Sequence, residues 1–414
     1  MIQEKIVSKR FGKVNPLSID SYIKYDGYQG LQKAVTMHPS QVIDEIEKSR
    51  IRGRGGAGFP AHIKVRALAN ASGTKYIVCN ADEGEPGNFK DRMLMENDPH
   101  SIIEGIAIVA YATGATKGYI YIRGEYQNAI KIIRATIQAA EEKGFLGKNI
   151  LDKGFDFKLE VRSGAGSYVV GEEFSMIESI EGKPGRSRTK PPFPTDKGIH
   201  DRPTLINNVE TFANFPHIIL VGGEEFTKVG TQSSTGTKLI SLSGNVKNKG
   251  LYEVPFGTSI RDVIFQLGKG VKNNRPIKMV QLGGASGPII PEYMLDMSID
   301  FDRFENFDSK TGTGAIIVMD DRFDLFDILL IDMKFFVHQS CGKCAPCREG
   351  HIQIVNLLNK FKSRRATEKD LMSLENLAHV IQQTSLCGLG QTSMTAIISS
   401  LRYFRDDYFA RVRY

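Results

Sequence analysis

The apolar residues in the first half of the chain alternate between two spacings. Continuous apolar runs at 76–79 and 118–122 are typical of buried strands. Between these runs, apolar residues recur every three or four positions on one face of a predicted helix, formed by Ile102, Ile103, Ile106 and Val109. Asp98 is the predicted cap of that helix and Pro99 its first residue. The alternation of strand and helix predicts a layered α/β domain.

The pattern changes twice further along the chain. From Thr237, short apolar runs separated by glycines predict a small β-rich unit with one helix after Ser259. After Arg322, four amphipathic segments predict a helical bundle, and Thr367 begins a capping box for the third of them. We therefore expect an α/β domain at 1–236, a β-rich unit at 237–322 and a helical bundle at 323–414.

Composition narrows the possible classes of protein. The chain has 414 residues, of which 41% are hydrophobic and 24% charged, as expected for a globular protein of two or three domains. The formal net charge of +7 is scattered along the chain, so no nucleic-acid binding is expected. We find no signal-peptide pattern and no run of about 18 apolar residues, and therefore expect a cytoplasmic protein without membrane insertion.

The first candidate site combines a glycine-rich loop with an acidic loop. Glycines within 52–60 let consecutive backbone N–H groups turn toward a phosphate, and Arg52 and Arg54 add charge of the matching sign. The acidic loop at 80–87 carries carboxylates that suit ribose hydroxyls. The spacing matches neither the dinucleotide fingerprint nor the P-loop. On these residues alone, a nucleotide or flavin site and an ordinary turn both stay open.

Two further glycine segments have weaker signals. Residues 164–173 predict a strand, a glycine turn and a helix start, where either a bound anion or the carboxylates of Glu172 and Glu173 can complement the helix dipole. The loop at 283–288 is interpreted as a structural turn, and we expect no chemistry from the β-rich unit beyond joining its neighbours.

The cysteines predict a metal centre. Of five cysteines, four lie in the C-terminal region, which argues against a disulfide framework. Cys341, Cys344 and Cys347 are spaced by three residues, and Cys387 lies between the last two predicted helices, so one end of a bundle can gather four thiolates. Zinc is one candidate, but this spacing is closer to that of 4Fe-4S ligands. Cys79, on a predicted buried strand, is interpreted as a core thiol.

Several of these segments together resemble one family. They are Arg-Gly-Arg-Gly-Gly-Ala-Gly-Phe at 52–59, Cys-Asn-Ala-Asp-Glu-Gly-Glu-Pro-Gly at 79–87, Tyr-x-x-Gly-Glu-Glu at 168–173, Asn-Asn-Val-Glu-Thr at 207–211, and Ser-Cys-Gly-Lys-Cys-Ala-Pro-Cys-Arg-Glu-Gly at 340–350 with Ser-Leu-Cys at 385–387. Together they resemble the flavoprotein subunit of NADH dehydrogenases. The resemblance implies an FMN-binding α/β domain, a β-grasp domain and a four-helix bundle that carries one 4Fe-4S cluster.

The same resemblance implies roles for individual residues. The residues expected to hold FMN are Gly53, Gly55, Lys64, Asn80, Asp82, Gly171, Asn207 and Asn208. Those expected to handle NAD(H) are Phe59, Glu85, Glu173, Lys190 and Phe193, with Glu85 as the catalytic residue. Arg54, Gly56, Glu83, Tyr168, Glu172 and Thr211 complete the implied cofactor site. The implied cluster ligands are Cys341, Cys344, Cys347 and Cys387.

The resemblance also implies a function and partners. It implies that FMN exchanges a hydride with NAD(H) and single electrons with the cluster. Those electrons pass to other iron-sulfur subunits, including a 2Fe-2S thioredoxin-like one. Residues 387–392 and 401–408 look more like the diaphorase subunits of soluble hydrogenases and formate dehydrogenases, some of which bifurcate electrons, than like respiratory complex I. A complex I subunit is the alternative, and a zinc-stabilised scaffold a remote one. Glu85 and Glu173 favour NADH, although Val65 and Ala67 replace bulkier residues common in the family.

Overall fold

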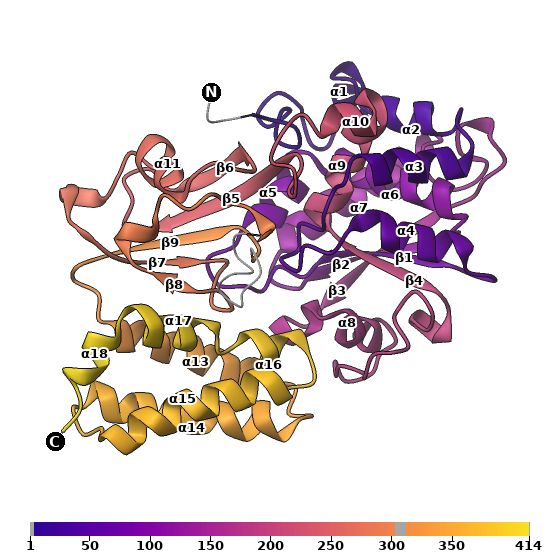
Figure 1. The fold of residues 1–414 in the computed structure, drawn as a ribbon. Helices are drawn as coiled ribbons and strands as arrows, with labels where there is room; N and C mark the ends of the chain where they lie inside the picture. The colour runs from indigo at the N-terminus through magenta and orange to yellow at the C-terminus, as the bar shows by residue number, and fades with distance from the viewer. Residues whose placement is uncertain (1–3, 303–311, 414) are drawn as a thin grey trace.

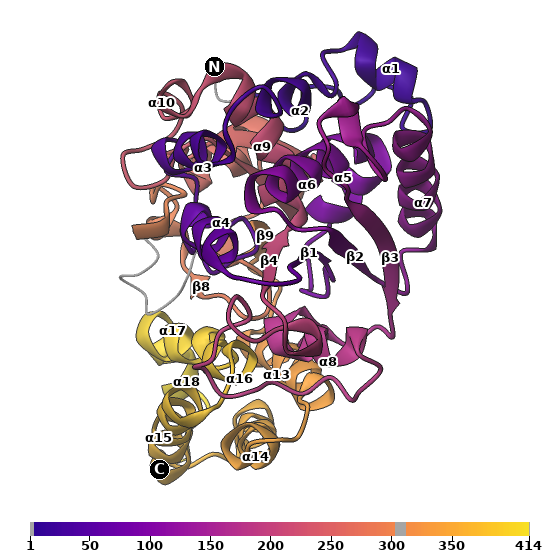
Figure 2. The same ribbon diagram turned by 90° about the vertical axis from the view of Figure 1, so that its right-hand side faces the viewer.

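The computed structural model describes residues 4–302 and 312–413. Its first part is built on a parallel four-stranded sheet with the order β3-β2-β1-β4. The strands are β1 Tyr76–Ala81, β2 Lys117–Arg123, β3 Lys158–Gly164 and β4 Thr204–Asn208. Figures 1 and 2 show the sheet with helices packed around it and the C-terminal helices on one side of it. The predicted α/β fold is confirmed, and the structure adds that its sheet is parallel.

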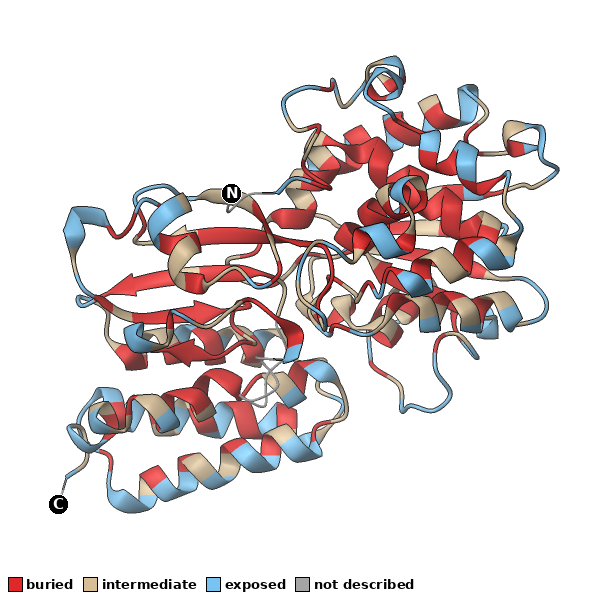
Figure 3. Ribbon diagram, turned by 45° about the horizontal axis from the view of Figure 1, so that its top comes forward, coloured by how far each residue is buried: buried red, intermediate tan, exposed pale blue. Residues whose placement is uncertain are grey.

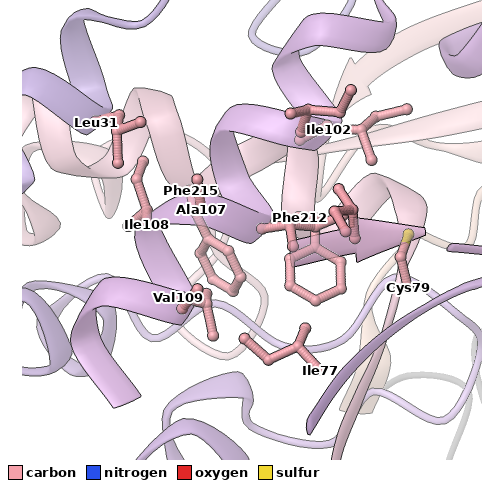
Figure 4. Close-up of a cluster of buried hydrophobic side chains, with 14 of the residues drawn as sticks. Leu31, Ile77, Cys79, Ile102, Ala107, Ile108, Val109, Phe212 and Phe215 are labelled. Atoms are coloured by element: carbon pink, nitrogen blue, oxygen red, sulfur yellow. The ribbon is translucent and has the colours of Figure 1, made fainter. Parts of the chain in front are cut away.

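The helices of this part surround the sheet. They are α1 Ile19–Lys24, α2 Gln29–Ala34, α3 Pro39–Lys48, α4 Ala61–Asn70, α5 Lys90–Asn97, α6 Pro99–Thr113, α7 Gln127–Glu142, α8 Glu173–Ile180, α9 Val209–Val221 and α10 Gly223–Phe226. Strand residues alternate between two cores: Ile77 and Cys79 pack in the core that contains α6 and α9, whereas Val78 faces the core that contains α8. Figure 4 shows the first of these cores, with Cys79 buried in it as predicted.

The predicted cap of α6 is only partly correct. Pro99 is the first residue of the helix and Asp98 precedes it, but the Asp98 side chain accepts no capping hydrogen bond. The carboxylate instead pairs with Arg10, at 3.3 Å between Nη1 and Oδ2. A distant cation therefore replaces the local partner that the sequence pattern indicated. By contrast, Thr367 forms its predicted capping box with Asp370.

The second sheet has the order β6-β5-β9-β7-β8 and mixes parallel with antiparallel pairs. Its strands are β5 Thr237–Gly244, β6 Gly250–Pro255, β7 Ile277–Leu282, β8 Ile289–Ile290 and β9 Ala315–Asp320. The helix predicted after Ser259 is α11 Ile260–Asp262, continued by a wider helical turn at Val263–Leu267. A five-stranded mixed sheet with this helix agrees with the expected β-grasp arrangement.

The C-terminal part is helical, as predicted. Its helices are α13 Leu325–Gln339, α14 Ala345–Lys362, α15 Glu368–Thr384, α16 Gly388–Thr392, α17 Thr395–Tyr403 and α18 Arg405–Phe409. In Figure 1 they lie beside the second sheet, and the Ile289 backbone N–H donates to the Ser399 hydroxyl at 2.9 Å. Figure 3 shows buried residues along the strands and exposed ones on the outer faces of α14 and α15. No helix within 4–302 and 312–413 has the length and apolarity of a membrane span.

Candidate functional site

A cavity of about 290 Å³ lies at the carboxyl ends of β1 and β4. Parallel strands direct the loops that follow them to one edge of a sheet, which is where α/β folds bind ligands. The wall also includes residues of the second sheet and of α16. The lining residues are Gly55, Gly56, Ala57, Asn80, Asp82, Glu83, Gly84, Glu85, Asn88, Asp91, Tyr168, Val169, Gly171, Glu172, Asn208, Ser286, Gly312, Thr313, Gly388, Leu389 and Thr392.

The structure brings most of the expected flavin residues to this cavity. Other expected residues do not line it, namely Gly53, Arg54, Phe59, Lys64, Glu173, Lys190, Phe193, Asn207 and Thr211. Close approaches and backbone geometry explain why the loop at 52–60 contains glycines. A Cβ on Gly55 would come within 3.1 Å of the Asn208 side chain, and Gly56 has a φ of +115° that favours glycine. Small residues therefore keep this side of the cavity open and lined by backbone.

The two arginines of the loop are held by other groups of the protein. Arg54 is fully buried and donates hydrogen bonds to the backbone carbonyls of Arg52 and Thr235, while its guanidinium carbon lies 4.7 Å from the Phe256 ring centroid. Arg52 donates to Asp302 at 3.0 Å. Both side chains hold the loop in place through protein partners, and the predicted charge match to a phosphate stays a prediction.

Two buried polar atoms beside the cavity have no partner. Asp82 Oδ2 and Asn207 Nδ2 make no hydrogen bond within the described part of the chain. Burial raises the pKa of Asp82 to about 7, against the opposing effect of Arg123. Unpaired buried polar groups are costly, so a ligand with hydroxyl and carbonyl groups, such as the ribityl chain and ring of FMN, fits this wall. Asn80 is already used differently, because its Nδ2 donates to the Gly171 carbonyl at 2.9 Å and joins two cavity segments.

The three carboxylates of the acidic loop differ in their surroundings. Glu83 accepts hydrogen bonds from the backbone N–H groups of Asp91 at 2.9 Å and Arg92 at 3.0 Å, at the start of α5. Burial raises the pKa of Glu83 to about 7. Its carboxylate therefore stabilises the protein, whereas Asp82 keeps an unpaired oxygen for a ligand.

Glu85 is held by residues from two distant segments. Tyr168 donates its hydroxyl to Glu85, and Ser286 donates both its backbone N–H, at 2.9 Å, and its hydroxyl, at 3.0 Å. Burial raises the pKa of Glu85, although these hydrogen bonds lower it. Ser286 belongs to the loop at 283–288, which the sequence interpretation treated as a turn without chemistry. The second sheet therefore contributes directly to the cavity, because its loop crosses to Glu85.

An ion-pair cluster lies at the start of α8. Glu173 accepts hydrogen bonds from Lys64 and from Lys190, the latter at 2.9 Å. Burial alone would raise the pKa of Glu173, but the two lysines lower it to about 2. Glu172 caps α8 by accepting from two backbone N–H groups of the first turn. Glu173 is thus kept ionised by two lysines, and Glu172 caps the helix. Both observations are compatible with the interpretation that these carboxylates complement the helix dipole.

Two aromatic rings expected near the nucleotide are exposed. Phe59 has 46% of its surface exposed and Phe193 has 52%. Lys64 Nζ lies 5.8 Å from the Phe59 ring centroid, so Phe59 stands beside the ion-pair cluster. Large exposed rings provide faces on which a planar group can stack.

The sequence interpretation missed a buried charge network beneath the cavity. Lys90, with no exposed surface, donates to Asp91 at 2.6 Å and to Asn208 Oδ1 at 3.1 Å, and pairs with Glu210 at 3.0 Å. Asn208 Nδ2 donates to Asp91 at 2.7 Å, and both residues line the cavity. Lys238 of β5 also pairs with Glu210. No local motif predicts this network, because its members come from distant segments.

The four thiols meet at one end of the bundle. Cys341 and Cys344 precede α14, Cys347 lies in its first turn, and Cys387 caps α16. Burial and the charges of the other three thiols together raise the pKa of Cys347 to about 11, so all four lie within electrostatic reach. Within the described ranges, no three metal-binding side chains are spaced to hold a single ion. The fit to a 4Fe-4S cluster rests on four thiols as donors.

The thiols and the cavity share a segment of chain. Gly388 and Leu389, which line the cavity, directly follow Cys387 in α16. Lys343, between two of the cysteines, donates to the Ser187 carbonyl at 2.7 Å. That bond joins the cysteine loop to the basic loop at 183–197. A ligand in the cavity would therefore lie next to a group held by the thiols.

Comparisons with known proteins agree with both centres. A family model described as the Nuo51 FMN-binding domain matches residues 46–217, and one described as the NADH-ubiquinone oxidoreductase-F iron-sulfur binding region matches residues 327–411. The NADP-reducing hydrogenase subunit HndC of Solidesulfovibrio fructosivorans is 45% identical over 411 residues, covering 99% of this chain and 84% of that protein.

A second relative and a solved structure cover nearly the whole chain. An NADH-quinone oxidoreductase subunit of Aquifex aeolicus is 44% identical over 400 residues, covering 97% of this chain and 92% of that protein. The crystal structure of an NAD+-reducing NiFe hydrogenase in the H2-reduced state matches with a TM-score of 0.86 and 31% identity, covering 99% of this chain and 67% of that one.

Proposed function

Because this chain belongs to the family of FMN- and 4Fe-4S-containing flavoprotein subunits of NADH dehydrogenases, we propose that it exchanges a hydride with NAD(H) and single electrons with a partner subunit. It is an oxidoreductase subunit with FMN and a 4Fe-4S cluster as cofactors. FMN, when bound, supplies the conversion between a hydride and single electrons. The observation that carries the proposal is the shared segment at Cys387, where a cluster ligand and the cavity wall are consecutive residues.

Several residues are proposed to bind and orient the flavin. Gly55 and Gly56 provide backbone next to Asn208, which is held by Lys90 and Asp91. Asp82 offers its unpaired oxygen to hydroxyl groups. The network beneath Asn208 fixes these groups before the flavin arrives, so less side-chain order must be gained on binding.

Other residues are proposed to place the dinucleotide. Glu85, fixed by Tyr168 and Ser286, is proposed to border the nicotinamide position, and the exposed rings of Phe59 and Phe193 to offer stacking faces. The Glu173 carboxylate, kept ionised by two lysines, would repel a 2′-phosphate, which favours NADH over NADPH.

The chain is related to subunits of multisubunit complexes, and we propose that it works in one as well. A soluble NAD-linked hydrogenase or formate dehydrogenase is our first assignment, supported by the hydrogenase relative and the hydrogenase structure. Complex I is the second, supported by the 44% identical NADH-quinone oxidoreductase relative. A 2Fe-2S thioredoxin-like subunit as partner, a cytoplasmic location and the domain boundaries at 236 and 322 stay predictions.

Two measurements on the anaerobically purified protein test the proposal. Acid extraction should release FMN in one-to-one ratio with protein, and NADH should bleach the bound flavin. Iron and acid-labile sulfide should be present, with a low-temperature EPR signal after reduction. Release of FAD, or no bleaching by NADH, would overturn the flavin assignment. Zinc in place of iron would favour the scaffold alternative instead.

A further inference from the structure

A serine hydroxyl lies beside one of the cysteine thiols. Ser340 directly follows α13, and Cys347 lies seven residues later, in the first turn of α14. Ser340 Oγ is 3.2 Å from Cys347 Sγ. The backbone N–H of Ser340 donates to the Phe336 carbonyl at 3.0 Å, so the last turn of α13 fixes the position of this serine. The contact between the hydroxyl and the sulfur therefore closes the loop that carries Cys341 and Cys344.

The partners of this hydroxyl decide which atom donates the hydrogen bond. A cysteine bound to iron is a thiolate, which has no proton to give. Ser340 Oγ accepts the backbone N–H of Gly342 at 3.2 Å, and this contact uses a lone pair of the oxygen but not its single proton. When Cys347 is a ligand, the proton between the two side chains therefore belongs to Ser340, and the sulfur accepts it.

A histidine near the same sulfur does not provide such a hydrogen bond. His351 Nδ1 lies 3.8 Å from Cys347 Sγ, and its Nε2 lies 2.8 Å from Ser393 Oγ. The Ser393 hydroxyl donates to the Gly390 carbonyl at 2.9 Å, so it accepts from Nε2–H of the ring. A neutral imidazole carries one proton, and none is left on Nδ1 for the sulfur. Ser340 and not His351 is therefore the donor to Cys347.

We propose that the Ser340 hydroxyl donates a hydrogen bond to the Cys347 sulfur and thereby makes the 4Fe-4S cluster easier to reduce. This inference rests on the proposed function, because it requires the cluster. Reduction by one electron adds negative charge, part of which falls on the ligand sulfurs. A donor aimed at a sulfur stabilises the reduced form more than the oxidised form, so it raises the midpoint potential. Ser340 is a positioning residue, since it acts through Cys347.

A redox titration of the anaerobically purified holoprotein, followed by EPR of the reduced cluster, tests this role. Ser340→Ala removes the donor, so the midpoint potential should become more negative. Ser340→Thr keeps a hydroxyl at the same position, so its potential should stay near that of the wild type. Ser363→Ala is the matched control, because Ser363 follows α14 as Ser340 follows α13, but its hydroxyl donates to the Asn359 carbonyl at 2.7 Å. The potential of this control should equal that of the wild type.

The outcomes separate this inference from the proposed function. Iron content and the wild-type EPR signal test whether the cluster exists, whereas only the differences between variants test Ser340. An unchanged or more positive potential in Ser340→Ala, with full iron content, overturns the inference. An equal negative shift in Ser340→Thr or in Ser363→Ala also overturns it, because the shift would then not depend on this hydroxyl. If Ser340→Ala fails to retain the cluster, Ser340→Thr decides: a wild-type potential supports the hydroxyl as donor, and a more negative one overturns the inference.

Discussion

The cavity at the sheet edge and the thiol centre at the bundle end are built in different ways. The cavity gathers glycines, single polar side chains and a buried charge network from segments far apart in the chain, such as Asn208, Asp91 and Ser286. The thiol centre uses one residue type from two short loops. The cavity is thus organised by the protein's own hydrogen bonds, whereas the thiol centre depends on the group that it binds.

The electrostatics of the two regions support this contrast. Lys90 is held among Asp91, Glu210 and Asn208, so opposite charges stabilise the cavity floor without a ligand. At the thiols, the charges of neighbouring cysteines add to burial in raising the pKa of Cys347 to about 11. Bringing four thiolates together is therefore unfavourable until iron binds them. The flavin domain should stay folded without its cluster, but the bundle end should not keep its geometry.

The largest expected effect comes from removing one cluster ligand. Cys387→Ser should alter or abolish the cluster EPR signal and stop electron delivery to the partner subunit, because the flavin loses its one-electron exit. FMN content and flavin bleaching by NADH should stay near wild type, since most of the cavity wall comes from the first α/β part of the chain and not from the bundle end.

The matched control is the cysteine outside this centre. Cys79→Ala changes a buried core thiol in β1 and should leave the EPR signal intact while lowering the free energy of unfolding by about 1 kcal/mol. An unchanged signal together with normal delivery in Cys387→Ser would show that this cysteine is not a ligand.

The second prediction removes the cation of the cavity floor. Lys90→Met leaves Asp91 with an uncompensated buried charge and releases Asn208, so the free energy of unfolding should fall by about 3–5 kcal/mol. FMN should be lost more readily on dilution, whereas the cluster signal should persist. Lys158→Met is the control, because its pair with Glu160 is exposed, so its free energy of unfolding should stay near that of the wild type. Equal stability of the two variants would contradict a structural role for the network.

The third prediction concerns pH and the contact between the bundle and the second sheet. Asp332 of α13 accepts a hydrogen bond from Gln281 Nε2 at 2.6 Å, and burial raises its pKa from 3.8 to about 7. The folded protein binds this proton more tightly than the unfolded chain does. The stability that Asp332 contributes is therefore fully present below about pH 4 and is lost as the pH rises through about 7.

Asp332→Asn should remove this loss. Relative to the wild type, the variant should gain up to about 4 kcal/mol in free energy of unfolding between pH 4 and pH 8, as measured by denaturant titration. Asp370→Asn should differ in sign, because the hydrogen bond from Lys360 lowers the pKa of Asp370 and stabilises the ionised form. Parallel pH profiles for Asp332→Asn and the wild type would contradict the buried-proton explanation.

The contrast between the two regions also explains what could be predicted from sequence. The strand at 76–79 and the capping box at Thr367 depend on neighbours within a few residues, and both are found. The four cysteines as one ligand set stay a prediction, because no three metal-binding side chains of the described residues are spaced to hold a single ion. The buried hydrogen bond of Arg54 and the ion pair of Asp98 were not predicted, because their partners, Thr235 and Arg10, lie in other segments.

The sequence interpretation predicted neither the contribution of the 283–288 loop nor the Lys90 network, and the physical reason is the same. Ser286 reaches Glu85 only because the second sheet packs beside the first, and Lys90 matters only because burial isolates its ion pairs. A glycine turn and a lysine are common at any surface. Their importance comes from tertiary packing, which local spacing does not encode.

The smallest expected effect is on the choice of nucleotide. Glu173 is kept ionised by Lys64 and Lys190, so its charge should oppose a 2′-phosphate. Glu173→Gln removes that charge and leaves Lys64 without its carboxylate partner, whereas Lys190 keeps its pair with Glu172 at 3.4 Å, so the change favours a phosphate further. The ratio of kcat/KM for NADPH to that for NADH should rise about tenfold, equivalent to about 1.4 kcal/mol. Initial rates of dye reduction with each nucleotide measure this ratio.

The control for this variant lies on the same helix. Glu178→Gln removes another carboxylate of α8, one that pairs with Arg188, and should leave the nucleotide ratio unchanged. A wild-type preference for NADPH, such as the name of the hydrogenase relative suggests for that protein, would show that Glu173 does not face the 2′ position. An equal rise in both variants would instead assign the effect to the general charge of α8. Only a rise confined to Glu173→Gln supports a contact between this carboxylate and the ribose, and it would place the dinucleotide beside the ion-pair cluster and outside the flavin cavity.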